Sequence, residues 1–211
     1  ASPRHLNLMW LISHPDAVRP REVLEYDHVF AASAPLAERL SAGMARISPA
    51  AGIGVSPLLQ CTDPALFHPP ETEPPSRGAV FVANSRGVER RIAHQAFEER
   101  LPVEIHGRQW ERFAANALVR GPGMANAEVA DLYRRSVVLN DHWADMRANG
   151  ILSNRLFDAA ACAAPVISDD IQGLQDTFSG LVAAWRPGQA LAPLVRAAVT
   201  EDAEARARRL A

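Results

Sequence analysis

The sequence predicts an α/β fold built on mainly parallel sheets, and three observations support this class. Short apolar runs rich in β-branched residues alternate with helical patterns along the 211 residues, which is typical of right-handed βαβ units. The runs AVFVA and SVVLN are continuously apolar, as expected of strands covered on both faces. A proline-rich stretch, HPPETEPPS from His68 to Ser76, divides the chain, because prolines interrupt helices and central strands.

Each expected element follows from its local pattern. Strands are expected where three to seven mainly apolar or β-branched residues stand between turn signals, and helices where apolar residues recur three and four positions apart. The expected strands are 6–12, 28–32, 55–59, 79–83, 103–106, 117–119, 137–140, 166–168 and 181–184. The expected helices are 35–42, 88–99, 126–134, 154–163, 171–178 and 188–198, with a last helical segment in 199–211. The first strand, within HLNLMWLIS, is expected to be buried.

The proline-rich stretch sets the predicted domain boundaries. Residues 1–70 carry three expected strands and a helix, which predicts the tail of one Rossmann-like domain. Residues 71–76 form the predicted linker, 77–198 a complete second domain, and 199–211 a C-terminal helix. The abrupt start in a strand and the end in an unfinished helix predict a fragment of a longer protein.

Composition and charge exclude several classes of protein. A formal net charge of −2 provides no general attraction for nucleic acid or an acidic membrane. No apolar run is long enough for a membrane helix, and no signal peptide opens the chain, so a cytoplasmic protein is expected. Cys61 and Cys162 lack paired spacing and are interpreted as small buried hydrophobes in a reducing compartment. The scattered histidines show no metal-ligand spacing, so no metal is expected.

All 22 basic residues are arginine, so an anion site here must use arginine forks, helix ends or backbone amides. The loop after strand 79–83 reads Asn84-Ser85-Arg86-Gly87 and precedes a helix that opens around Val88 and carries two more arginines, Arg90 and Arg91, near its start. Its amides and the guanidinium groups of Arg86 with Arg90 or Arg91 are candidates for binding phosphate. The alternative is a solvated loop with surface arginines. The loop is not a GxGxxG motif, which argues against a nicotinamide cofactor.

A second candidate lies at the helix after strand 137–140. Ser153 is a good helix cap, Asn154 and Arg155 follow it, and Asp158 is the only acid inside the helix. Arg155 is a cation at the helix end that disfavours cations, so a diphosphate bound there would compensate for it, while Asp158 accepts from a sugar hydroxyl. The alternative is a surface arginine whose head group points to water.

Three further residues follow strand ends. His106 and Gly107 end the strand VEIH, and Gly121 lies in the turn VRGPG, where bare backbone would meet a planar base. A structural histidine and an ordinary turn are the alternative interpretations.

Taken together, several segments resemble a known family. YDHVFAASAPLAERL, LLQCTDPALFHP, VFVANSRGVERR, IHGRQW, NAEVADLYRRSVVLND and GILSNRLFDAAACAAPVISDD occur in the order seen in GT-B glycosyltransferases of the spore-maturation-protein (spore coat glycosyltransferase-like) type. The C-terminal halves of these enzymes are similar to the retaining family-4 group. The resemblance covers nearly the whole chain and is most specific from Leu132 to Asp170.

The resemblance implies a metal-independent transferase without a cofactor, acting in cell-envelope or spore polysaccharide glycosylation. Its donor would be a nucleotide-diphosphate sugar held by the C-terminal domain, and its acceptor a glycan, protein or small molecule held by the N-terminal domain. The implied diphosphate contacts are Ser85, Arg86, Arg90, Arg91, Ser153, Asn154 and Arg155. The implied ribose contact is Asp158, the implied base contacts are His106, Gly107 and Gly121, and His14 is the candidate catalytic base.

The sequence departs from the family pattern in two places. Ala163 and Ala164 stand where a glycine usually ends the small-residue helix, and Gly150 replaces the upstream acid of the family-4 E-x7-E pair. The second departure leaves the stereochemical outcome open. Two other functions stay open because most of the acceptor domain is expected to be missing: a non-catalytic nucleotide-sugar-binding or assembly module, and a nucleotide-sugar epimerase, which needs no second acceptor.

Overall fold

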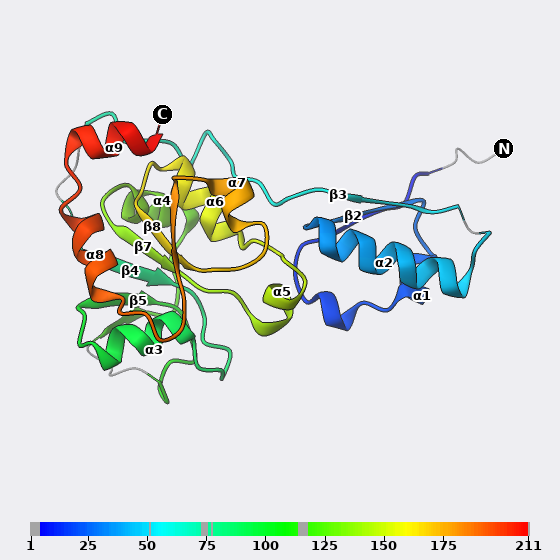
Figure 1. The fold of residues 1–211 in the computed structure, drawn as a ribbon, viewed down its shortest axis with the longest axis horizontal. Coiled ribbons are helices and arrows are strands. Elements are labelled where there is room, and N and C mark those ends of the chain that lie inside the picture. Colours follow the sequence, from blue (N-terminus) through cyan, green and yellow to red (C-terminus); the bar gives the residue numbers. More distant parts are fainter. Residues whose placement is uncertain (1–4, 51, 73–75, 77, 114–117, 211) are drawn as a thin grey trace. The chain divides into compact units, whose positions relative to one another are not determined.

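The computed structural model describes residues 5–50, 52–72, 76, 78–113 and 118–210, which form two compact units (Figure 1). The first unit comprises Ala1–Gln60, His142–Ser153 and Ile171–Gly173, and the second comprises Cys61–Asp141, Asn154–Asp170 and Leu174–Ala211. Each unit has its own parallel sheet, of three strands in the first and six in the second. The α/β fold class predicted from the sequence is confirmed.

The first unit packs helices on its sheet. The strands β1 (Leu8–Leu11), β2 (His28–Ala31) and β3 (Gly54–Pro57) pair in the order β1-β2-β3. The helical elements are η1 (Pro15–Ala17), α1 (Pro20–Val23), α2 (Ala34–Ile47) and α5 (Ala144–Ala148). Ser33 caps α2, because its Oγ accepts a hydrogen bond of 3.1 Å from the Leu36 amide. The core residues of this unit include Val29, Ala31, Leu36, Leu40 and Ile151.

The expectation that the first strand is fully buried is wrong for β1. Leu8 is 56% exposed and Trp10 is 42% exposed, whereas Leu11 is buried. The strand lies at an edge of the three-stranded sheet, and alternate side chains of a strand point to opposite faces. Leu8 and Trp10 therefore share the exposed face, and Trp10 Nε1 donates to the carbonyl of Leu58 at 3.0 Å.

The second unit contains a six-stranded parallel sheet in the order β6-β5-β4-β7-β8-β9. Its strands are β4 (Ala79–Val82), β5 (Val103–His106), β6 (Val119–Gly121), β7 (Val137–Asn140), β8 (Val166–Asp169) and β9 (Val182–Trp185). Its helices are α3 (Arg91–Glu98), α4 (Asn126–Arg134), α6 (Asn154–Ala161), α7 (Leu174–Phe178), α8 (Ala192–Val199) and α9 (Ala203–Leu210). These elements lie where the apolar runs and periodicities predicted them, with ends shifted by a few residues. The first residue of the expected strand 117–119 lies outside the described residues.

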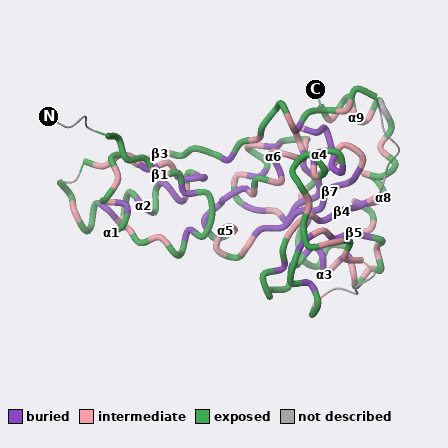
Figure 2. The backbone as a smooth tube through the Cα atoms, turned by 180° about the vertical axis from the view of Figure 1, so that it is seen from behind, coloured by how far each residue is buried: buried purple, intermediate pink, exposed green. Residues whose placement is uncertain are grey.

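The core of the second unit forms between the sheet and the helices on its faces. Phe81, Ile105, Leu139 and Ile167 from the strands pack with residues of α3 and α8, including Ile92. Helix α6 contacts β7, β8 and α4. Figure 2 shows buried backbone along β4 and β7, the two central strands. In the part of the chain that the structure describes, no helix has both the length and the apolar character needed to cross a membrane.

Residues 61–70 belong to the second unit, whereas the sequence placed them in the first and put a linker at 71–76. The Phe67 ring packs on Tyr133 with centroids 6.5 Å apart. Arg134 donates from Nη2 to the Leu66 carbonyl at 2.7 Å and from Nε to the His68 carbonyl at 3.0 Å. These contacts join residues distant in sequence, so local composition does not reveal them. Within the expected linker, residues 73–75 lie outside the described residues.

The two cysteines differ in their surroundings. Cys162 is buried, as expected, and burial raises the pKa of its thiol to about 11. Cys61 is exposed, so the expectation of a buried residue is wrong there. The nearby apolar residues Leu58 and Leu59 are themselves exposed, so they form no buried surroundings for this thiol.

The end of α6 explains why a glycine is usual there. The amides of Ala164 and Ala163 donate to the carbonyls of Ala159 and Ala160 at 3.1 and 2.9 Å, which is the Schellman pattern of a helix end. Ala163 has φ +56°, a left-handed conformation that disfavours any residue with a Cβ. Arg209 from α9 donates to the Ala163 carbonyl at 3.1 Å. The helix therefore ends in the same motif without the usual glycine, and Ala163 adopts the strained left-handed conformation instead.

We expect Ala163→Gly to stabilise the second unit by about 1 kcal/mol, because glycine adopts the left-handed conformation without the Cβ penalty. Urea denaturation of the two proteins measures the difference. The control is Ala164→Gly, at a neighbouring residue that does not have positive φ, where glycine should be neutral or destabilising. Equal effects of the two substitutions would contradict the assignment of strain to Ala163.

Candidate functional site

The strand order of the second sheet reverses between β4 and β7. From β4 the chain proceeds through β5 to β6 on one side, and from β7 through β8 to β9 on the other. In open α/β sheets, ligands bind beyond the carboxyl ends of the strands at this kind of switch point. Val82 and Asn140 are the last residues of β4 and β7, so the candidate site lies beyond them.

Arg155 reaches this edge from the first turn of α6. Its Nε donates to the Val82 carbonyl at 2.9 Å, and its Nη1 donates to Oδ1 of Asn140. Its guanidinium carbon lies 5.2 Å from the centroid of the Phe81 ring. All of these partners are formally neutral, and no ion pair to Arg155 is found within the described residues. Arg155 is thus a half-buried cation that contacts no carboxylate among the described residues, although its charge acts over a longer distance on Asp158, one turn along α6.

Arg90 has the opposite environment. It is only 4% exposed, its Nε donates to Asp141 Oδ1 at 2.6 Å, and its Nη2 donates to the Asp141 carbonyl at 2.6 Å. The second carboxylate oxygen of Asp141 accepts from the Ile92 amide at 3.2 Å. Burial lowers the pKa of Arg90, although the Asp141 charge opposes this shift. The charge of Arg90 is therefore compensated inside the protein, and the pair fixes the start of α3 to the end of β7.

The loop after β4 is a tight turn. The Val88 amide donates to the Ser85 carbonyl at 3.2 Å, and the two residues between them, Arg86 and Gly87, have φ of +55° and +72°. Positive φ at both central residues is the pattern of a type I′ turn. Ser85 is buried and its Oγ donates to the Val88 carbonyl at 3.0 Å, so the Arg86 side chain is exposed at a turn that is internally bonded.

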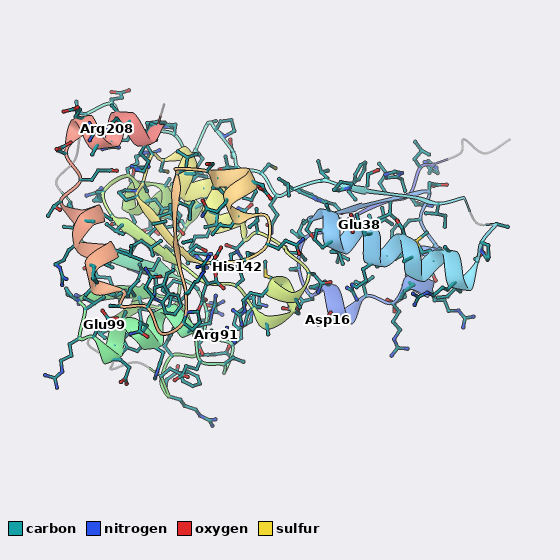
Figure 3. All side chains as sticks on the ribbon, viewed as in Figure 1. Asp16, Glu38, Arg91, Glu99, His142 and Arg208 are labelled. Atoms are coloured by element: carbon teal, nitrogen blue, oxygen red, sulfur yellow. The ribbon has the colours of Figure 1, made fainter. Side chains whose placement is uncertain are left out.

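Arg91 is exposed at the first residue of α3, and Glu99 follows the other end of that helix (Figure 3). Arg86 and Arg91 thus flank the buried Arg90 in the chain, and they are the exposed members of the predicted arginine group.

The Asn140 side chain belongs to a chain of hydrogen bonds along the carboxyl edge. Its Nδ2 donates to Ser168 Oγ at 2.8 Å, and Asn140 and Ser168 are register partners on β7 and β8. The Ser168 hydroxyl reaches Asp169 Oδ1 at 3.3 Å and the Asp169 carbonyl at 3.2 Å. Asn140 and Ser168 are fully buried, and Asp169 is 3% exposed.

Asp158 lies one turn into α6 and is held from two sides. Its Oδ1 accepts from Thr62 Oγ1 at 2.7 Å, and its Oδ2 accepts from Asn154 Nδ2 at 2.8 Å. Each oxygen retains a further lone pair for a ligand hydroxyl. Thr62 was not among the predicted site residues, since its role depends on residues 61–70 folding back onto the second unit.

The predicted base contacts meet at the ends of β5 and β6. His106 and Gly121 are register partners, and the Gly107 amide donates to the Gly121 carbonyl at 2.9 Å. Gly107 has φ +155°, and a Cβ there would lie 2.0 Å from the Ala83 carbonyl oxygen. This glycine therefore permits β5 to approach the end of β4. His106 Nε2 lies 3.8 Å from Glu104 Oε2.

Two predicted residues belong to the first unit. The Ser153 amide donates to His142 Nε2 at 3.0 Å, which makes His142 a hydrogen-bond acceptor there. His14 has φ +52°, is exposed, and its Nδ1 lies 3.1 Å from Ser13 Oγ. The structure does not bear on the roles predicted for these two residues.

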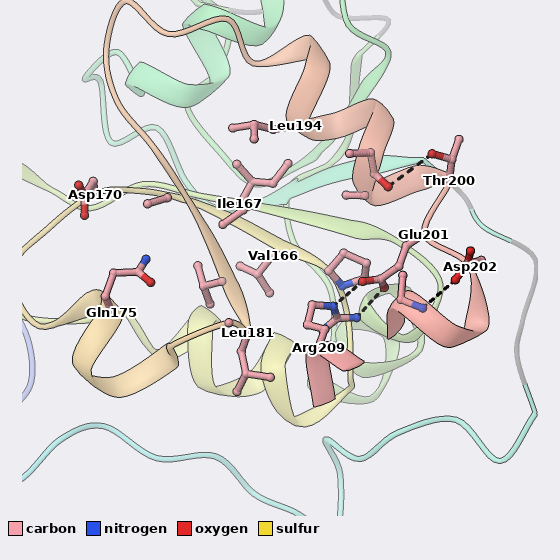
Figure 4. Close-up of a pocket in the computed structure, with 18 of the residues that line it drawn as sticks. Val166, Ile167, Asp170, Gln175, Leu181, Leu194, Thr200, Glu201, Asp202 and Arg209 are labelled. Atoms are coloured by element: carbon pink, nitrogen blue, oxygen red, sulfur yellow. Dashed lines mark hydrogen bonds and ion pairs between the residues drawn. The ribbon is translucent and has the colours of Figure 1, made fainter. Parts of the chain in front are cut away.

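A pocket of about 860 Å³ in the second unit contains none of the predicted residues. It lies beside the edge strand β9 and is lined mainly by apolar side chains such as Val166, Leu181 and Leu194 (Figure 4). Its charged groups include Glu201 and Arg209, which pair with each other through bonds of 2.8 and 2.9 Å. Among the described residues, no group of three or more His, Cys, Asp or Glu side chains is placed to hold a metal ion.

Sequence reasoning missed the partners of the predicted residues. Asn140 and Asp141 carried a usable signal, because polar residues directly after a buried strand lie at the carboxyl edge. No local sequence pattern indicated that three other residues belong to the site, namely Thr62, Ser168 and Tyr133. Tyr133 is buried beside Arg155, and burial raises the pKa of its hydroxyl to about 12, although the Arg155 charge opposes the shift.

Comparison with known proteins agrees with this architecture. Residues 86–211 match the family model described as glycosyl transferase-like. No curated protein matches the chain. The structure is similar to sucrose-phosphate synthase from Thermosynechococcus elongatus, with a TM-score of 0.56 and 15% identity over 90% of this chain and 55% of that one. It is also similar to AviGT4, a glycosyltransferase involved in avilamycin A biosynthesis, with a TM-score of 0.53 and 14% identity over 91% of this chain and 72% of that one.

These structural likenesses concern the fold, which is of the GT-B type. The chain spans little more than half the length of the sucrose-phosphate synthase that it matches.

We expect Gly107→Ala to destabilise the second unit by more than about 2 kcal/mol, because the new methyl group would overlap backbone atoms of Ala83 in a strained conformation. The control is Gly123→Ala, where a Cβ would meet no atom within 4 Å. Thermal and urea unfolding measure both variants. A Gly107→Ala protein as stable as the control would contradict the close approach of β5 to β4.

The carboxyl of Asp158 makes stability depend on pH. Burial raises its pKa, while the hydrogen bonds from Thr62 and Asn154 and the charge of Arg155 oppose the shift. A raised pKa means that the folded protein binds this proton more tightly than the unfolded chain, so stability falls as pH rises through this range. We expect Asp158→Asn to be more stable than the wild type at neutral pH, with a difference that shrinks toward about pH 4. Urea denaturation at several pH values measures it, and a difference independent of pH would refute the assignment.

Proposed function

The chain belongs to the glycosyl transferase-like family, and we propose that it binds a nucleotide-diphosphate sugar at the carboxyl edge of β4 and β7 and takes part in transferring the sugar to an acceptor. The resemblance to the spore-maturation-protein type supports this proposal and assigns a glycan, protein or small molecule as acceptor. The reaction requires no metal in this proposal.

The observation that carries the proposal is the environment of Arg155. A half-buried cation that makes no direct ion pair is unfavourable in a folded protein, and this one also lies in the first turn of α6, where the helix dipole disfavours it. An anionic ligand at this position would remove both penalties. Arg90, by contrast, already has Asp141 as its counter-ion. Of these two arginines, Arg155 is therefore the one whose charge a bound anion would stabilise.

The neighbouring groups suit a diphosphate. The first amides of a helix have no partners within the helix, and α6 begins at Asn154, so its first turn supplies donors beside Arg155. Arg155 contacts the carbonyl of Val82, directly before the loop that carries Ser85 and Arg86. Arg86 and Arg91 would supply forks for the phosphate oxygens. We assign Arg90 to the support of this group through Asp141.

The other ends of the donor are assigned by position. Asp158 would accept from the ribose hydroxyls, with Thr62 and Asn154 holding its carboxylate. His106, Gly107 and Gly121 would contact the base at the ends of β5 and β6. Ser153 as a phosphate contact and His14 as a base toward the acceptor stay predictions from the family resemblance.

The chemistry follows from where charge develops. When the bond between the anomeric carbon and the diphosphate breaks, negative charge grows on the leaving phosphate oxygen. Arginine forks and helix amides placed there bind the transition state more tightly than the ground state and so lower the barrier. In this proposal they supply the stabilisation that a divalent metal could otherwise provide.

We expect uridine or guanosine diphosphate, in the presence of a metal chelator, to raise the melting temperature of the protein by mass action. Arg155→Ala should weaken nucleotide binding by roughly tenfold to a hundredfold, since a hydrogen bond between charged groups is lost. Arg155→Lys should fall between, because it keeps the charge without the fork. Isothermal titration calorimetry measures the affinities.

The matched control is Arg208→Ala, which removes the same charge from the exposed surface of α9. Its affinity should equal that of the wild type. Absence of binding by any nucleoside diphosphate at millimolar concentration, or equal binding by Arg155→Ala and the control, would reject the proposal. Binding without transfer or hydrolysis of any sugar nucleotide would favour a non-catalytic binding module.

A further inference from the structure

The hydrogen bonds that hold Arg155 run in one direction across three adjacent strands. Arg155 donates to the Val82 carbonyl on β4 and to Oδ1 of Asn140 on β7, and Asn140 Nδ2 donates to Ser168 Oγ on β8. The Ser168 hydroxyl in turn reaches Oδ1 of Asp169 at 3.3 Å. It also reaches the Asp169 backbone carbonyl at 3.2 Å, which can only accept a hydrogen bond, so the hydroxyl proton of Ser168 points toward Asp169.

This direction fixes the orientation of the Asn140 amide. With its proton turned to Asp169, Ser168 Oγ presents a lone pair to Asn140, which must then place Nδ2 toward Ser168 and Oδ1 toward Arg155. The flipped amide would place an NH₂ group against the guanidinium and an oxygen against the Ser168 lone pair. Asn140 and Ser168 are both fully buried, so water does not compete for these groups.

The choice of an amide has an electrostatic consequence. An aspartate at position 140 would hold the guanidinium equally well but would neutralise it, as Asp141 does for Arg90. An asparagine oxygen accepts the same hydrogen bond with no net charge. The Phe81 ring, 5.2 Å from the guanidinium carbon, is likewise a neutral partner that favours a cation on its face. Arg155 is therefore held in place by neutral groups alone, and its charge acts on Asp158 without a direct contact.

We propose that Asn140 and Ser168 are positioning residues for the donor diphosphate, which hold Arg155 as a preorganised cation at the carboxyl edge without forming an ion pair with it. This inference rests on the proposed function, because it assumes that Arg155 meets the diphosphate. Preorganisation matters for arginine in particular, since ordering its flexible side chain during binding costs affinity.

The test compares binding of uridine diphosphate, guanosine diphosphate and inorganic pyrophosphate to the wild type and four single variants. Asn140→Asp should weaken binding by at least about tenfold, because the new carboxylate neutralises Arg155. Asn126→Asp is the matched control: it adds the same charge by the same substitution at the exposed first residue of α4, which has no assigned donor contact, and it should cost less than about threefold because solvent and salt screen it. Ser168→Ala should cost about threefold to tenfold, the usual worth of one hydrogen bond, and Ser168→Thr, which keeps the hydroxyl, should restore affinity.

A merely structural role of Ser168 is separated by a double-mutant cycle. If Ser168 acts through Arg155, Ser168→Ala should have no effect on affinity in a protein that already carries Arg155→Ala. A similar loss in both backgrounds would overturn the inference, as would equal losses for Asn140→Asp and Asn126→Asp. Those results leave binding by the wild type intact and so spare the proposed function. A wild-type protein that binds none of the three probes overturns both.

Discussion

The pairing of β4 with β7 is the constraint on which the candidate site depends. It places the reversal of strand order in the middle of the second sheet, so that the chain leaves these two neighbouring strands toward opposite sides. No connection between strands therefore needs to cross over the ends of β4 and β7. The first turn of α3 follows β4 along the chain, and the first turn of α6 contacts both strands through Arg155. Val82, Asn140 and Asp141 become near neighbours although they come from distant parts of the sequence.

Two arginines use this edge in different ways, and Phe81 lies beside both. The guanidinium carbons of Arg90 and Arg155 each lie 5.2 Å from the Phe81 centroid, and the ring packs edge to face on Trp110 at 5.7 Å. Arg90 forms a buried salt bridge with Asp141, which links the start of α3 to the end of β7. Arg155 contacts the Val82 carbonyl, the Asn140 amide and the Phe81 ring, which are all neutral, and in the proposed function it meets the diphosphate. Two residues of the same type at one edge thus differ in whether a carboxylate is in contact with them.

Much of the fold follows from local pattern. The alternation of apolar runs with amphipathic stretches predicted the strands and main helices of both units, and the polar residues after strand ends predicted the region of the site. The local pattern was misleading where contacts between distant parts of the chain, or a position at a sheet edge, decided whether a residue is buried and which unit it packs with. Trp10 and Leu8 are exposed on an edge strand, Cys61 is exposed, and residues 61–70 pack with the second unit through contacts to Tyr133 and Arg134.

The sequence by itself determined the α/β class, the parallel sheets and the arginine-rich edge, because apolar periodicity and turn residues act over a few neighbouring positions. Only the tertiary structure decided which arginine is compensated. The Arg90–Asp141 pair joins residues 51 positions apart, and Arg155 reaches Val82 across 73 positions. Charge compensation depends on distances of a few ångströms between such residues. Those distances arise from strand order, which no local pattern records.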